Sequence, residues 1–177
     1  MFLYLAMIDS DADKSKFELL YNEYKNLMYY TANRILRNSS DAEDVVHQAF
    51  LKVIEILDTI SSPRCHKTRA LLVTITEHKA IDLYREKQRR NVLPLAEEYV
   101  GAAPAAEIER LAERDTLAAA IAALPPRYRS VLLLRYDCGY SNAEIANILD
   151  TTEPNVRKLI QRAKEKLSAK LSGMEEP

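Results

Sequence analysis

Glycine is scarce in this chain. Only Gly101, Gly139 and Gly173 occur among its 177 residues, and no two of them lie close together. Phosphate-binding loops of the P-loop and dinucleotide types need several closely spaced glycines, so both classes of nucleotide-binding enzyme are excluded. Few glycines also mean few turns with positive φ, and strong helix formers dominate the rest of the sequence. The sequence therefore predicts an all-α fold rather than a hairpin-rich β fold.

The charge is unevenly distributed, although the net charge is only -1. Residues 64–90 carry eight basic and three acidic side chains, and residues 153–170 carry six basic and two acidic ones. The interval between them, residues 91–115, is acidic and contains prolines, which is typical of a linker. A charged helix face is most often merely solvated. Two basic segments on either side of a linker nevertheless favour nucleic-acid binding.

Apolar residues recur every three or four positions through the first half, which predicts three helices. Residues 16–37 form the first helix. Ser40 and Glu43 have the spacing of a capping box and are expected to start the second helix. The polar face of this second helix is free for a partner and consists of Asp41, Asp44, Gln48, Lys52 and Glu55. A third helix ends in the basic tail 85–90, and the three helices form a first domain, residues 16–90.

Residues 1–15 are predicted to be an N-terminal extension. Their opening run, residues 1–8, is apolar, but it lacks a basic flank and a cleavage site and is too short to cross a bilayer. We interpret it either as a hydrophobic docking strip or as a frayed extension. Cys65 and Cys138 lie far apart, outside any metal-ligand spacing, so no disulfide, metal site or other cofactor is predicted. These features predict a cytoplasmic protein.

A helix-turn-helix is predicted in the second half, residues 115–172, after a linker over residues 91–114. A Pro-Pro pair interrupts the start of this half, because proline suits only the first turn of a helix. Residues 127–136 are expected to form the short helix that follows. Ser141 can cap the next helix, and Asp150 stands in the following turn, where it tolerates left-handed geometry. The last helix buries an apolar stripe and leaves basic and polar side chains outside. Helical pairs that only pack together are common, so a purely structural pair is the alternative.

Several segments carry a resemblance to a known family. They are DAEDVVHQAF at residues 41–50, LVTITEHKAIDLYREKQRR at residues 72–90, and LPPRYRSVLLLRY, YSNAEIANIL and NVRKLIQRAKEKL in the second half. Together they resemble the extracytoplasmic-function group of the sigma-70 family, over about residues 16–171. The resemblance implies two small helical domains, sigma domain 2 and sigma domain 4, joined by a linker. It also implies a bacterial transcription initiation factor that is not itself an enzyme and that directs core RNA polymerase to promoters.

The resemblance further implies three sets of site residues. The clamp helices of the largest polymerase subunit are expected to contact Asp41, Glu43, Asp44 and Gln48. The -10 promoter element, which is opened, is expected to contact Arg64, Lys67, His78, Lys79, Arg85 and Arg89. The -35 element is expected to contact Asn155, Arg157, Lys158, Gln161 and Arg162. Ala70 and His78 replace the family's usual tryptophan and asparagine, so His78 becomes the candidate for base capture. An anti-sigma factor is a further expected partner, whereas a membrane is not.

Three other functions remain open from the residues themselves. A stand-alone helix-turn-helix regulator would use the second half and leave the first domain unexplained. A metal-dependent helical enzyme could place ligands at Glu43 and His47, or at His78 and Asp82, because each pair is one helical turn apart. Such pairs are mostly solvated neighbours. A protein-binding adaptor without DNA contacts would bind independently of salt, whereas phosphate contacts weaken as salt rises.

Overall fold

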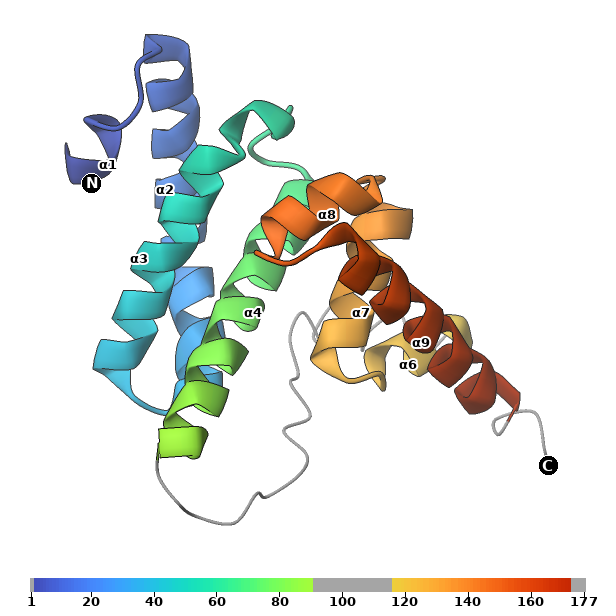
Figure 1. Cartoon of the computed structure of the whole chain (residues 1–177). Coiled ribbons are helices and arrows are strands. Elements are labelled where there is room, and N and C mark those ends of the chain that lie inside the picture. The colour runs from blue at the N-terminus through green and yellow to red at the C-terminus, as the bar shows by residue number, and fades with distance from the viewer. Residues whose placement is uncertain (1, 91–115, 173–177) are drawn as a thin grey trace. The chain divides into compact units, whose positions relative to one another are not determined.

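The computed structural model of the chain describes residues 2–90 and 116–172 (Figure 1). The regular elements in these two ranges are all helices, which confirms the all-α prediction. The expected linker, residues 91–114, lies outside the described residues. The chain divides into two compact units, residues 1–97 and residues 98–177. No helix in the described ranges is both long enough and apolar enough to cross a membrane.

Three long helices form the body of the first unit (Figure 1). They are α2 (Asp11–Leu36), α3 (Ser39–Glu55) and α4 (His66–Arg90), and each of them packs against the other two. The short helices α1 (Phe2–Leu5) and η1 (Leu57–Thr59) complete the unit. Its core consists of fully buried apolar side chains, among them Phe17, Leu20, Met28, Val45, Phe50, Leu71, Leu72 and Ile75. The apolar stripes that the sequence predicts therefore meet in one core.

Two helix starts differ from the prediction. Helix α2 begins at Asp11 rather than at residue 16, because the Ser10 side chain caps it by accepting a hydrogen bond from the Asp13 amide at 3.4 Å. Helix α3 is capped by Asn38 rather than Ser40, and Asn38 Oδ1 accepts from the Asp41 amide at 3.1 Å. Both serine and asparagine are favoured N-caps. Ser10 and Asn38 each have an extended backbone directly before their helix, as an N-cap requires. Ser40 already lies inside the first turn of α3.

The sequence predicts Lys52 on the polar face of α3. The structure instead buries this residue, with 5% of its surface exposed. Its Nζ donates a hydrogen bond to Glu55 Oε2 at 2.9 Å. Lys52 adjoins the buried positions Ala49 and Val53, so its apolar stem is covered while its ammonium group reaches a carboxylate at the edge.

The N-terminal residues pack against the first unit instead of fraying from it. Tyr4 and Ile8 are each 8% exposed, and residues 11–15 form the first turns of α2. The expected extension over residues 1–15 is therefore divided between α1, a short connection and the start of α2.

The second unit is built around the last helix, α9 (Glu153–Ser172), which packs against α6 (Thr116–Ala122), α7 (Pro126–Leu132) and α8 (Asn142–Ile148). Pro126 occupies the first turn of α7, where its missing N–H costs nothing. The helix predicted to continue to residue 136 changes at Leu133 into the π-helical turn η2 (Leu133–Asp137), in which the Cys138 amide donates to the Leu133 carbonyl at 2.9 Å. Gly139, with φ of 83°, then reverses the chain.

The helix-turn-helix is formed by α8, a short turn and α9. Ser141 and Glu144 make a reciprocal capping box at the start of α8, which confirms the predicted cap. At its end, Asp150 adopts φ of 48°. The Thr151 amide donates to the Ala146 carbonyl and the Asp150 amide to the Asn147 carbonyl, at 2.9 and 3.3 Å, which is a Schellman motif. This turn sets the direction in which α9 leaves α8.

Candidate nucleic-acid interface

Helix α9 separates a buried side from an exposed side. Val156, Ile160 and Ala163 are buried against the rest of the second unit. The residues expected at the -35 element are all exposed, and they are Asn155, Arg157, Lys158, Gln161 and Arg162. Arginine, lysine, asparagine and glutamine are the side chains that most often contact base edges and phosphates in the major groove. This half of the chain is thus a helix-turn-helix whose second helix offers a polar, basic surface.

Several of these side chains have partners on α9 or in the turn before it. An Arg157 guanidinium nitrogen lies 2.5 Å from Glu153 Oε1, and Gln161 Nε2 donates to Glu165 Oε1 at 3.1 Å. Asn155 Nδ2 donates to Thr151 Oγ1 at 2.9 Å. Exposed i, i+4 pairs of this kind are weak, at about 0.3–0.5 kcal/mol. They can therefore be exchanged for contacts to DNA at little cost.

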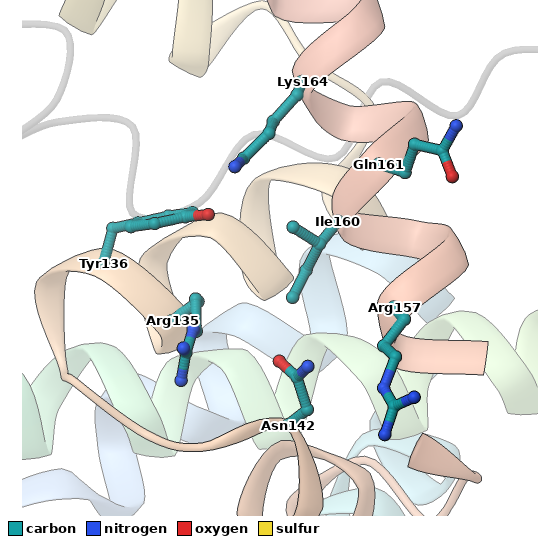
Figure 2. A pocket seen from close by; sticks show the side chains of 7 residues that line it. All are labelled: Arg135, Tyr136, Asn142, Arg157, Ile160, Gln161 and Lys164. Atoms are coloured by element: carbon teal, nitrogen blue, oxygen red, sulfur yellow. The ribbon is translucent and has the colours of Figure 1, made fainter. Parts of the chain in front are cut away.

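A cleft of about 350 Å³ opens beside this surface, between η2 and α9 (Figure 2). Its lining residues are Arg135, Tyr136, Asn142, Arg157, Ile160, Gln161 and Lys164. Lys164 Nζ lies 5.2 Å from the centre of the Tyr136 ring, which is a cation-π distance. Three cations and no carboxylate line the cleft, so it suits an anion such as a DNA phosphate.

The sequence pattern did not single out Arg135, Tyr136 or Asn142 as interface candidates. The spacing of apolar residues predicts one continuous helix over residues 127–136. The π-helical turn instead rotates Arg135 and Tyr136 relative to that helix. Such turns occur frequently at functional sites, but no simple sequence pattern marks them.

The loop before α4 is held in place by backbone contacts. Tyr24 Oη donates to the Pro63 carbonyl at 3.0 Å, and Thr68 Oγ1 donates to the Ser62 carbonyl at 2.7 Å. The hydrogen bonds between Thr68 and Cys65 also lower the pKa of the Cys65 thiol. This loop presents Arg64, whose Nε lies 3.4 Å from the Glu23 carboxylate.

The side chains expected at the -10 element spread along one side of α4. By helical spacing Lys67, His78, Arg85 and Arg89 share a face, and Lys79 lies beside it. Lys67, Arg85 and Arg89 are exposed, while His78 and Lys79 are half-buried. Together with Arg64 before the helix, these residues form a basic track whose exposed cations lie near the two ends of α4.

His78 is partly enclosed. Its side chain is 22% exposed, and its Nδ1 lies 3.8 Å from Asp82 Oδ2. The interaction with His78 lowers the pKa of the Asp82 carboxyl below its ordinary value. Its Nε2 is buried and has no hydrogen-bond partner among the residues that the structure describes. The role of His78 in base capture stays a prediction.

The residues of α3 that are expected to bind polymerase differ in exposure. Glu43, Asp44 and Gln48 are exposed. The Asp41 side chain is only 17% exposed, and both of its oxygens lie 2.5 Å from Lys87 Nζ on α4. The structure therefore groups Asp41 with the basic tail of α4 instead of leaving it free beside the other three.

The residue pairs that could have held a metal do not extend into larger clusters. Within residues 2–90 and 116–172, no three His, Cys, Asp or Glu side chains come together as a metal site would require. His47 Nδ1 is hydrogen-bonded to Tyr4 Oη at 2.6 Å.

Comparison with known proteins identifies both units. The family model "Sigma-70 region 2" matches residues 20–90, and the model "Sigma-70, region 4" matches residues 114–167. The ECF RNA polymerase sigma factor SigW of Bacillus subtilis is 28% identical, over 90% of this chain and 90% of SigW. The ECF RNA polymerase sigma factor SigL of Mycobacterium tuberculosis is 27% identical, over 86% of each chain.

Two solved structures are also similar. CnrH in complex with the cytosolic domain of CnrY has 27% identity and a TM-score of 0.39, with 89% of this chain and 88% of CnrH covered. The sigma factor RpoE of Bartonella quintana, in complex with the anti-sigma factor NepR, has 16% identity and a TM-score of 0.40, with 88% and 96% covered.

The class of protein follows from the two family models and the helix-turn-helix together: a DNA-binding transcription initiation factor. More particularly, the chain belongs to the extracytoplasmic-function group of the sigma-70 family.

Proposed function

We propose that α9 reads the -35 element of promoters while α4 and the loop before it hold the opened -10 element. The observation that carries this proposal is the division of α9, whose five candidate residues are all exposed while its opposite side is buried. Asn155, Arg157, Lys158, Gln161 and Arg162 enter the major groove. Arg135 and Lys164, in the cleft beside them, neutralise a phosphate of the flanking backbone.

The basic track on α4 holds phosphates of the separated strand. Arg64, Lys67, Lys79, Arg85 and Arg89 supply the charge, because binding a single strand requires cations along its backbone. It also requires a flat side chain against which an unstacked base can rest, and the partly exposed His78 is the candidate.

The exposed acidic face of α3 binds core RNA polymerase. Asp44 and Gln48 lie one helical turn apart on this face, and Glu43 adjoins Asp44. Carboxylates exposed on a helix pair with cations of a partner and set the register of binding. Asp41 acts differently from these three, because its pairing with Lys87 positions the tail of α4.

The remaining assignments follow the family. We place sigma domain 2 at residues 16–90, the linker at residues 91–114 and sigma domain 4 at residues 115–172. The protein works in the cytoplasm, is not itself an enzyme, and has an anti-sigma factor as an additional partner. Copurification of a tagged chain from its source organism tests that last partner, since an anti-sigma factor should be recovered in stoichiometric amount.

Run-off transcription tests the function directly. Core RNA polymerase from the source organism is incubated with a genomic fragment library, with and without the full chain. We expect discrete transcripts only when the chain is present. A stand-alone helix-turn-helix regulator would bind fragments without conferring start sites on core polymerase, and that result would overturn the proposal. A protein-binding adaptor would fail to retain DNA at any salt concentration.

A further inference from the structure

The apolar run at the N-terminus has no role in the function proposed so far. In the structure it forms α1 and the connection to α2 (Figure 1). Its side chains differ in exposure. Tyr4 and Ile8 face inward and are each 8% exposed. Leu3 and Met7 are 68% and 56% exposed. Two large apolar side chains four positions apart thus remain in solvent beside a segment that is itself firmly packed.

Tyr4 fixes this segment against α2 and α3. Its ring centre lies 5.4 Å from that of Phe17, 5.9 Å from that of Tyr21 and 6.0 Å from that of Phe50. Aromatic rings at such distances attract one another beyond the area they bury. Burial raises the pKa of the Tyr4 phenol above its ordinary value. The position of α1 is therefore set by an aromatic cluster and not by chain connectivity alone.

The contact with α3 places α1 at the edge of the exposed acidic face. Tyr4 Oη and His47 Nδ1 are 2.6 Å apart, and their ring centres are 5.3 Å apart. His47 directly precedes Gln48 and lies three positions after Asp44. The exposed Leu3 directly precedes Tyr4, and the Met7 amide donates a hydrogen bond to the Tyr4 carbonyl at 3.0 Å. Both exposed apolar side chains thus belong to a segment that contacts α3 at His47, one helical turn from Asp44.

We propose that Leu3 and Met7 form the apolar part of the polymerase-binding surface and that core RNA polymerase, rather than a separate partner, covers them. This inference rests on the proposed role of α3. Its physical basis is that a protein interface has an apolar centre and a polar, charged rim. A flexible methionine also adapts to the surface it meets. The matching polymerase surface would carry cations opposite Asp44 and apolar side chains opposite Leu3 and Met7.

The test measures the dissociation constant of the full-length chain for core RNA polymerase. Leu3→Ser combined with Met7→Ser should weaken binding about tenfold, which is equivalent to about 1.4 kcal/mol. The swap Leu3→Met with Met7→Leu keeps the apolar volume and should bind within about twofold of the parent. Tyr30 on α2 is 62% exposed and is not among the residues of the proposed surface, so Tyr30→Ser is the matched control and should also bind normally.

Asp44→Arg separates failure of this inference from failure of the proposed function. If Asp44→Arg weakens binding while the double serine variant binds like the parent, α1 has no part in the interface and the inference is wrong. If neither variant weakens binding, the polymerase surface lies elsewhere and both assignments fall. Thermal unfolding of the double serine variant should match that of the parent, because both replaced side chains are exposed. A lowered midpoint together with weak binding would assign Leu3 and Met7 to folding, and would overturn the inference.

Discussion

Lys87 on α4 and Asp41 on α3 form an ion pair in which the Lys87 Nζ lies 2.5 Å from both carboxylate oxygens of Asp41. The two residues are 46 positions apart in sequence, so the pair ties the basic tail of α4 to the first turn of α3. It also joins a residue expected to bind polymerase to the helix expected to bind DNA. The tail of α4 is therefore oriented by the same helix that carries the acidic face.

Asp41→Asn is expected to lower the free energy of unfolding of the chain by up to about 1 kcal/mol, since the pair is partly exposed and such pairs contribute little more. Asp44→Asn, on the same helix but exposed, should leave that free energy unchanged. Urea unfolding followed by circular dichroism measures both. Equal stability of the two variants and the parent would show that the Asp41–Lys87 pair does not hold α4.

Arg157→Ala combined with Arg162→Ala is expected to abolish preference for promoters with an intact -35 element while core polymerase still binds. If each arginine contacts one phosphate, the slope of log affinity against log salt should fall by about 2. Filter binding on matched promoter fragments at several salt concentrations measures this. Lys170→Ala, in the last turn of α9, is the control. Unchanged promoter choice in the double variant would remove α9 from the recognition of the -35 element.

His78→Ala is expected to reduce opening of the -10 element more than binding to the closed duplex. Permanganate reactivity of promoter thymines reports opening, and mobility shift reports duplex binding. His78→Phe retains a flat ring and should restore much of the opening if stacking is the contact. Equal permanganate reactivity in the alanine variant and the parent would instead leave His78 with only its contact to Asp82.

Ser141→Ala is expected to destabilise the second unit by about 1 kcal/mol at neutral pH, because it removes one half of the capping box of α8. Hydrogen bonds from Ser141 lower the pKa of the Glu144 carboxyl from its ordinary value of 4.5. A carboxyl group whose pKa is lower in the folded state stabilises the fold at pH values above its ordinary pKa. This stabilisation is lost as the pH falls through the lowered pKa.

The stability difference between Ser141→Ala and the parent should therefore shrink as pH is lowered through and below 4.5. Thermal unfolding across pH measures it. Ser168→Ala, exposed within α9, serves as the control and should show no such pH dependence. A difference that stays constant with pH would mean that the Ser141 hydroxyl does not stabilise the Glu144 carboxylate, since the variant keeps the backbone N–H of residue 141.

The exposed surface of α9 is the part of the candidate site whose placement the sequence predicts best. A helix of 20 residues with a 3.6-residue apolar repeat has only one side that can be buried, so the exposure of Arg157 and Lys158 follows from the repeat. The same reasoning placed Lys52 wrongly, because a long side chain beside the stripe can bury its stem. It also could not foresee the cleft around Tyr136, which depends on the π-helical turn.

The amino-acid sequence by itself determined the features that depend on near neighbours. These are the helical repeats, the capping box at Ser141 and the left-handed turn at Asp150, each of which is decided by residues fewer than five positions apart. Tertiary structure alone decided the pairing of Asp41 with Lys87 and of Tyr4 with His47, which are 46 and 43 positions apart. Contacts of that kind depend on how whole helices pack, and no local pattern of residues encodes the angle and register of that packing.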